Sequence, residues 1–413
     1  MSPLSSDVPA PGASGLSRKW LLAGILGAVV LLFIGLSTAA GVPFRNDFAA
    51  YWPVGRLLLT GQNPYDAGAI EALQRSVGDN LGGDSVVRYP PWSLPLLLPF
   101  AALPYVPGWY LWIFLQAALV GVSSVWLWTL FAGARGRIGA LAIGLLFPPT
   151  LIMALGGQIG GVLLFSATAF FWAADRRRDL LAGICLWILA TKPHLFIPLG
   201  LIVVFWAIYE RRLLVPSVAC LSIAAGSLIS ISLRPEVFPE YVDFVQASAP
   251  TGYLPVTLGG LARLVGGADR FWVQWIPSLL ILAMIPVLWS RARRNWNWIT
   301  YGPGILALGL LSGPYGLVHD LVLLIPCILL MAVMVRLGSD VTVGRIALWG
   351  YVATCIAIWI GQLRTGTSFV QVWVAPLILF ACIMLRRTSA APSATPVSVR
   401  RSDSGEGRER RVG

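Results

Sequence analysis

Asp47 is the carboxylate in this sequence whose position most readily suggests a reaction. It opens a segment between two apolar runs, and helical spacing over residues 47–60 puts it on one face with Tyr51, while Arg56 points away. A carboxylate on an apolar face is costly unless it has a partner or a task. We expect Asp47 to be either a general base or a structural group, capping the helix or pairing with Arg45, and spacing alone favours the structural roles.

Three basic side chains stand where the chain breaks between apolar runs. Arg88 and Tyr89 precede two prolines, and a guanidinium there could bind a lipid phosphate or anchor the chain at a membrane interface. Lys192 and His194 flank a proline between two short apolar runs. Broken helices are tolerated at membrane depth where they line a cavity. A lysine in such a cavity could neutralise an anionic head group.

The second histidine, His319, stands next to Asp320 after a segment rich in Gly and Pro. The pair could be structural, bind an acceptor or act as an acid/base relay, and spacing does not decide between these roles. The five cysteines lie in apolar runs without C-x-x-C spacing, so we expect neither a disulfide framework nor a metal site. Asp47 follows Asn46 rather than a second acid, which argues against a metal clamp made of two carboxylates.

The elements that position these residues are predicted to be membrane helices. Hydrophobic residues make up 57% of the 413-residue chain and charged residues 12%, whereas a soluble domain carries about 25% charged residues. A shorter run, 91–104, is bracketed by prolines and is predicted to be re-entrant. Twelve apolar runs are candidates for spans: 20–41, 107–131, 138–155, 158–174, 180–191, 195–209, 213–233, 272–290, 297–313, 320–335, 344–362 and 369–385.

Arginine placement predicts the orientation of these spans. If both termini are cytoplasmic, most of the basic residues fall on the inside, as the positive-inside rule requires. The long loops 42–90 and 234–271 then lie outside, with all the polar candidates above. Residues 1–19 and 386–413 are expected to be disordered cytoplasmic ends around one transmembrane domain, 20–385. The net charge of +12 is explained by this asymmetry, so we expect contact with membrane lipids and no nucleic-acid partner.

With these residues in place, the chain resembles GT-C-type glycosyltransferases, and more narrowly glycosyltransferase family 87, which includes polyprenol-phosphate-mannose-dependent mannosyltransferases. The resemblance covers residues 20–385. It implies an all-α polytopic bundle of about twelve transmembrane helices, with amphipathic helices in the first outside loop. The motifs that carry it are found in the following order: Asn46-Asp47-Phe48 with Tyr51, the run 61–66, Arg88-Tyr89-Pro90-Pro91, Gly157-Gln158, Lys192-Pro193-His194 and His319-Asp320.

The resemblance also implies a mechanism. A sugar, mannose by preference, would pass with inversion from a polyprenyl-phosphate donor to a lipid or glycan acceptor at the outer face of the plasma membrane, in cell-envelope biosynthesis and without a cofactor. Asp47 would be the general base and His319 a second catalytic residue. The donor phosphate would bind Arg88, Lys192 and His194. Positioning of donor or acceptor would fall to the remaining candidates: Tyr51, Tyr89, Gln158 and Asp320.

Two other functions fit a dozen helices around a polar outer cavity. One is a transporter or flippase of a lipid-linked glycan, which needs access from both faces and is often built from repeated halves. The sequence has no evident internal repeat, and its polar loop residues concentrate on one side, which favours the enzyme. The other is an inactive scaffold subunit of an envelope-building complex, which only an activity assay separates from the enzyme.

Overall fold

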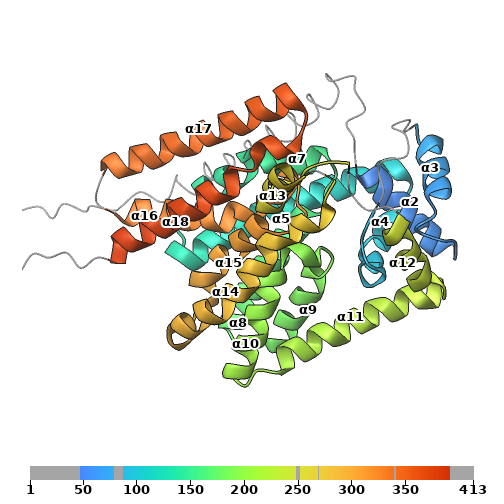
Figure 1. The fold of residues 1–413 in the computed structure, drawn as a ribbon, viewed down its shortest axis with the longest axis horizontal. Coiled ribbons are helices and arrows are strands. Elements are labelled where there is room, and N and C mark those ends of the chain that lie inside the picture. Colours follow the sequence, from blue (N-terminus) through green and yellow to red (C-terminus); the bar gives the residue numbers. More distant parts are fainter. Residues whose placement is uncertain (1–46, 79–86, 248–251, 268, 339–340, 391–413) are drawn as a thin grey trace, which may run out of the picture.

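The computed structural model describes residues 47–78, 87–247, 252–267, 269–338 and 341–390, and they form helices joined by short connections (Figure 1). Within these ranges there is no β-strand. The α-helices are as follows: α2 (Phe48–Leu59), α3 (Ala67–Ser76), α4 (Leu98–Ala101), α5 (Tyr105–Ala132), α6 (Arg137–Leu146), α7 (Pro148–Leu155), α8 (Gly160–Asp175), α9 (Asp179–Leu189), α10 (Ile197–Tyr209), α11 (Leu214–Leu233), α12 (Val237–Ala247), α13 (Leu258–Gly266), α14 (Ile276–Ala292), α15 (Trp298–Ser312), α16 (Ile325–Leu337), α17 (Val341–Thr365) and α18 (Val374–Ala390).

Six short 3₁₀ helices join or extend these elements in the described part of the chain. They matter here because two of them, η2 and η5, carry polar residues of the site. Their bounds are as follows: η1 (Pro91–Leu96), η2 (Pro193–Leu195), η3 (Phe271–Trp275), η4 (Arg293–Asn295), η5 (Val318–Leu324) and η6 (Ser368–Gln371).

Six helical segments among the described residues are long and apolar enough to cross a membrane. A seventh crossing is formed if α6 and α7, which meet at 57°, count as one broken span. Two consecutive prolines at the start of α7 cause this break, because proline lacks the N–H that would continue the hydrogen bonding of α6. The chain is therefore an all-helical membrane protein. Four shorter apolar helices, of 10–17 residues, complete the bundle: α8, α9, α10 and α15.

Each apolar run predicted after residue 41 coincides with one helix or with a pair of adjoining helices. The run 20–41 and the predicted disordered N-terminus, 1–19, lie outside the described residues. Of the C-terminal end predicted to be disordered, 386–413, the first five residues instead continue helix α18, and 391–413 lie outside the described residues. Twelve crossings therefore stay a prediction. The segment 91–104, predicted to be re-entrant, forms η1 and α4, which pack against α11, α2 and α5; its re-entry into a membrane also stays a prediction.

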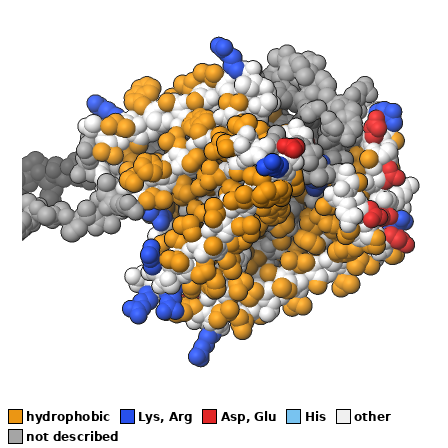
Figure 2. All heavy atoms as spheres, viewed as in Figure 1, with side chains coloured by type: hydrophobic (Ala, Val, Ile, Leu, Met, Phe, Trp, Pro, Cys, Tyr) orange, Lys and Arg blue, Asp and Glu red, His pale blue; other side chains and the backbone are white. Residues whose placement is uncertain are grey.

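Contacts between the helix connections sort them into two sets. The arginine-rich connections meet one another, as Arg336 Nη1 donates to the Arg135 carbonyl over 2.9 Å and Asn297 Nδ2 to Asp175 Oδ1 over 2.8 Å. The connections predicted to be outside also meet, as in the 2.9 Å hydrogen bond from Val256 N to the Gly316 carbonyl. Each of these contacts joins connections that the predicted topology places on the same side of the membrane, and the orientation itself stays a prediction. In Figure 2 the surface is mostly apolar, with basic side chains around the left and lower margins and acidic ones mainly at the right.

The described part of the first predicted outside segment, 42–90, contains the helices α2 and α3, and of these α3 alone has the expected amphipathic surface. In α3 two of ten residues are buried. In α2, by contrast, ten of the twelve residues are buried, because α3, α4 and α5 enclose it. The predicted amphipathic helix at 47–60 is thus present but is a packed core element. Arg56 does point away from Tyr51, and it is exposed.

Candidate active site

Asp47 lies where α2 meets the end of α7. Its backbone N–H donates to the Gly156 carbonyl over 2.8 Å, which ties the start of α2 to the turn that precedes α8. Asp47 occupies the N-cap position of α2, yet its side chain makes no capping hydrogen bond. The side chain of Asp47 therefore does not cap α2, although spacing favoured a structural role of this kind. The other structural role cannot be compared, because Arg45 lies outside the described residues.

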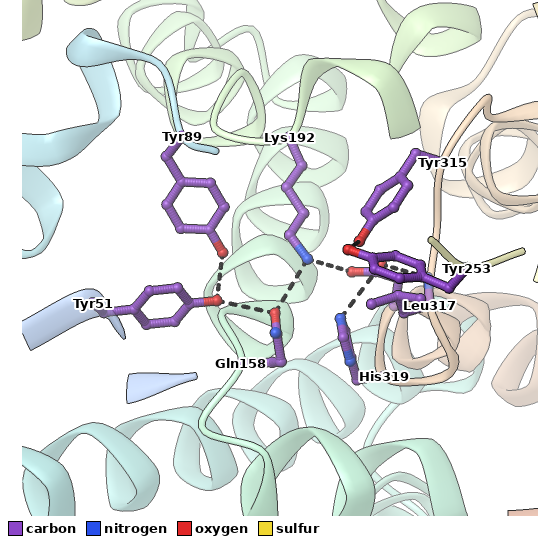
Figure 3. A network of polar contacts seen from close by, with 9 residues as sticks. Tyr51, Tyr89, Gln158, Lys192, Tyr253, Tyr315, Leu317 and His319 are labelled. Atoms are coloured by element: carbon purple, nitrogen blue, oxygen red, sulfur yellow. Dashed lines mark hydrogen bonds and ion pairs between the residues drawn. The ribbon is translucent and has the colours of Figure 1, made fainter. Parts of the chain in front are cut away.

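Tyr51, one turn after Asp47, joins three distant segments of the chain. Its hydroxyl lies 2.7 Å from that of Tyr89 and donates to Gln158 Oε1 over 3.0 Å (Figure 3). The turn that holds Gln158 needs Gly157 at φ 65°, a backbone conformation in which a side chain is strained. The Trp112 indole N–H fixes the same turn by donating to the Gly157 carbonyl over 2.6 Å.

Lys192 and Asp320 form a buried ion pair at the centre of this network. Lys192 Nζ donates to Asp320 Oδ1 over 2.7 Å and to Gln158 Oε1 over 3.3 Å (Figure 3). The two charged side chains are only 8% and 1% exposed. Asp320 Oδ2 also accepts the backbone N–H of Leu317 over 3.0 Å, so both oxygens of the carboxylate have partners. An ion pair withdrawn from water in this way is held by good geometry and extra hydrogen bonds.

Burial and neighbouring charges together set the protonation of Lys192 and the two tyrosines. Burial lowers the pKa of Lys192, but the Asp320 carboxylate more than offsets this and the pKa ends above its ordinary value, so the ammonium persists. Burial raises the pKa of Tyr89 to about 12 and that of Tyr51 well above its usual range. Asp47 is near enough to contribute to all three of these shifts. The network therefore holds neutral phenols beside one ammonium that is paired with the Asp320 carboxylate.

His194 lies beside this centre with an enclosed ring nitrogen. Its Nε2 has no hydrogen-bond partner among the described residues, and its ring meets the Tyr315 ring edge-on at a centroid distance of 5.6 Å. The Tyr315 hydroxyl lies 2.8 Å from that of Tyr253. Arg88 is close enough to Tyr315 to act on it electrostatically. Burial, reinforced by the Lys192 charge, lowers the pKa of His194 to about 4, so this imidazole is neutral near pH 7.

His319 is placed on the other side of Asp320. Its Nε2 lies 3.6 Å from Asp320 Oδ2, which is within ion-pair range but longer than a hydrogen bond. The residue is buried, at 8% exposure. Close approach of α15 to η2 keeps this region compact, because a Cβ on Gly309 would come within 2.1 Å of the Leu195 carbonyl oxygen.

The structure brings most of the residues singled out in the sequence to one place. Hydrogen bonds and ion pairs join six of them into a single network: Tyr51, Tyr89, Gln158, Lys192, Asp320 and His319. Asp47, Arg88 and His194 lie around it, each within electrostatic range of a member or of a neighbouring tyrosine. Their roles stay predictions. Within the described residues there is no group of three or more His, Cys, Asp and Glu that could hold a metal ion.

Sequence reasoning did not single out Tyr253 and Tyr315. Both lie in connections that were predicted to be outside, and Tyr315 lies between Pro314 and Gly316 in the segment rich in Gly and Pro that precedes His319. The sequence does not indicate that these two connections contact each other. That pairing depends on the 2.9 Å backbone hydrogen bond from Val256 to Gly316, far apart in the chain.

A buried polar network inside an apolar helical bundle is an arrangement expected of an enzyme that works within a membrane. The model of glycosyltransferase family 87 matches residues 88–314, more than half of the chain, and the protein belongs to this family. It is accordingly a membrane glycosyltransferase, with a sugar donor and an acceptor as substrates. The match includes Arg88, Gln158 and Lys192; Asp47 and Asp320 lie outside its limits. Neither the curated proteins nor the solved structures contain a match to the chain.

Proposed function

We propose that this protein transfers a sugar, mannose in the first instance, from a polyprenyl-phosphate donor to a hydroxyl of a lipid or glycan acceptor, with inversion. The observation that carries the proposal is that Asp47 lies within electrostatic range of a buried polar network centred on Lys192, inside an apolar helical bundle. A lipid-linked donor would reach such a site from the bilayer, and its phosphate would meet cationic groups there. Membership of family 87 supports sugar transfer, and the choice of donor and sugar rests on the resemblance of the sequence motifs to the polyprenol-phosphate-mannose-dependent members of that family.

In the proposed reaction, Asp47 takes the proton of the acceptor hydroxyl. The acceptor oxygen attacks the anomeric carbon and forms the new C–O bond as the bond from that carbon to the phosphate oxygen breaks. The electron pair of the broken bond leaves with the polyprenyl phosphate. Charge on the leaving phosphate is stabilised by Arg88 and Lys192, and such stabilisation is a large term where water is scarce. His194, being neutral near pH 7, would donate a hydrogen bond from a ring N–H instead of a charge.

The remaining members of the network would position these groups. Tyr51 and Tyr89 stay protonated and can donate to substrate oxygens. Gln158 holds Tyr51 and Lys192 through one oxygen, Oε1. His319, the second catalytic residue of the proposal, would share a proton relay with Asp320, from which it is separated by 3.6 Å.

We place the site at the extracytoplasmic face of the plasma membrane, with both termini in the cytoplasm. The support is the segregation of the arginine-rich connections from the set that surrounds the polar network, together with the rule that basic loops stay inside. A cysteine introduced at the exposed position Asp243, in the second predicted outside loop, should react with an impermeant thiol reagent applied to intact cells. Reaction only after the cytoplasmic side is opened would reverse the orientation.

The proposal is tested by sugar transfer in proteoliposomes, with polyprenyl-phosphate-linked mannose, glucose and arabinose offered in turn. Wild type should transfer from at least one donor, and Asp47→Asn should lose transfer while it remains folded. The matched control is Asp243→Asn, which removes an exposed carboxylate of α12 and should keep wild-type activity. Transfer at the wild-type rate by Asp47→Asn would eliminate Asp47 as the base, and no transfer from any donor would refute the donor class.

A further inference from the structure

The ammonium group proposed to receive the donor phosphate is already neutralised. Lys192 Nζ lies 2.7 Å from Asp320 Oδ1, and both side chains are almost fully enclosed. A phosphate arriving beside this pair meets a carboxylate as well as a cation, and like charges repel strongly where water is excluded. The site as it stands is therefore closed, electrostatically, to a second anion at Lys192.

We propose that Asp320 is a resident counterion of Lys192 that the donor phosphate replaces, so that Asp320 sets how tightly this site holds a lipid phosphate. The inference rests on the proposed function, because it takes a polyprenyl phosphate as the incoming anion. It assigns Asp320 a positioning role: the carboxylate acts through Lys192 and keeps the buried ammonium paired whenever the site is empty. Leaving either charge unpaired would be strongly destabilising.

When Lys192 turns to the phosphate, Asp320 loses its cation and keeps one hydrogen bond, a cost that the contacts of the donor phosphate must offset. The second oxygen of Asp320, Oδ2, keeps the backbone N–H of Leu317 at 3.0 Å and has His319 Nε2 at 3.6 Å. The η5 helix that carries Asp320 is fixed on α7, α8, α15 and α16, so the carboxylate stays in place while a ligand moves the lysine.

Lys192 has the complementary freedom. Its long aliphatic side chain can swing the ammonium over several ångströms, and Gln158 Oε1, at 3.3 Å, offers it a neutral partner on the side away from Asp320. Arg88 and His194 border the same region near Tyr315, and could hold the other phosphate oxygens. Exchange of one anion for another then leaves the charge on Lys192 compensated before, during and after binding.

The test measures the affinity of the detergent-solubilised full chain for geranyl phosphate, with geraniol as the uncharged control. Asp320→Asn keeps an oxygen for Leu317 N–H but removes the competing charge, so it should bind geranyl phosphate about tenfold more tightly than wild type. The donor KM should fall with it and the acceptor KM should not change, a split that a merely structural role would not produce. Lys192→Met should weaken binding, and the double variant should match Lys192→Met.

Equal or weaker binding of geranyl phosphate by folded Asp320→Asn would overturn the inference alone. Wild type that bound geraniol as tightly as geranyl phosphate would instead overturn the proposed function.

A second measurement observes Lys192 directly and leaves every residue of the network unchanged. The chain has two lysines, so Lys19→Arg protein labelled with ¹⁵N-lysine reports Lys192 through a single ammonium signal. Saturating geranyl phosphate should shift that signal while geraniol does not; an unmoved signal would contradict the exchange.

Discussion

Replacing Lys192 by Met tests whether the ion pair at the centre of the site is as buried and as well paired as the structure shows. Met has nearly the length of Lys and no charge. The substitution removes the 2.7 Å contact to Asp320 and the 3.3 Å contact to Gln158, and leaves a carboxylate that is 1% exposed without its cation. Asp320→Leu makes the opposite change and leaves the ammonium uncompensated.

The expected magnitudes follow from the burial of the pair. Removing one partner of a buried ion pair lowers the free energy of unfolding by about 3–5 kcal/mol, because an uncompensated charge stays out of water. Replacing both partners by apolar groups removes that penalty, so Lys192→Met/Asp320→Leu should regain most of the loss. The remaining deficit should be about 1–3 kcal/mol, because the N–H of Leu317 loses its acceptor and the contact of Lys192 with Gln158 is lost as well.

Unfolding by sodium dodecyl sulfate in mixed micelles, followed by near-ultraviolet circular dichroism, measures these differences. The control is Arg75→Met, which breaks a pair with Glu71 of 3.9 Å whose side chains are 61% and 41% exposed; its effect should stay within about 1 kcal/mol. Single variants of the buried pair that unfold like wild type would refute the reasoning. A double variant as unstable as the sum of the singles would also contradict it.

Three further outcomes follow from the geometry. Gly309→Val should lower the free energy of unfolding by about 1–3 kcal/mol, since its Cβ would meet the Leu195 carbonyl at 2.1 Å, while Gly304→Val on the same helix meets nothing within 4 Å and shows the intrinsic helix effect alone. The pKa of His194 is lowered to about 4 in the folded protein, so between about pH 6.5 and pH 4 the unfolded chain binds more protons than the folded one. The free energy of unfolding should therefore decrease as the pH is lowered from about 6.5 to 4. His194→Gln should flatten this part of the pH dependence in the same unfolding assay. Tyr51→Phe loses contacts to Tyr89 and Gln158 and should reduce transfer roughly tenfold with unchanged expression, so an unaltered rate would remove Tyr51 from the site.

Much of the fold could be predicted from the sequence because apolar runs and prolines act locally. The predicted run 138–155, for example, falls on α6 and α7, but the 57° bend at Pro148 depends on how the two halves pack. The burial of α2 was not predictable from its own composition. That surface is covered by α3, α4 and α5, and a helix cannot show in its sequence which neighbours will enclose it.

Sequence reasoning could identify most residues of the site but not which of them contact one another. Polar side chains that interrupt apolar runs stand out, and Gln158, Lys192 and Asp320 all did so. Their pairing joins residues up to 128 positions apart, and no local spacing indicates which cation meets which anion. Lys192 was therefore expected to be available to a phosphate, whereas it is held by Asp320. Tyr253 escaped notice because its partner Tyr315 belongs to a different connection.

The most direct test of the central claim is the stoichiometry of the products. Proteoliposomes with wild type or Asp47→Asn are given a polyprenyl-phosphate-linked sugar and an acceptor, and both glycosylated acceptor and free polyprenyl phosphate are counted by mass spectrometry. We expect one polyprenyl phosphate for each sugar transferred by wild type, and neither product from the variant. Transfer without release of polyprenyl phosphate, or equal yields from both proteins, would contradict the account.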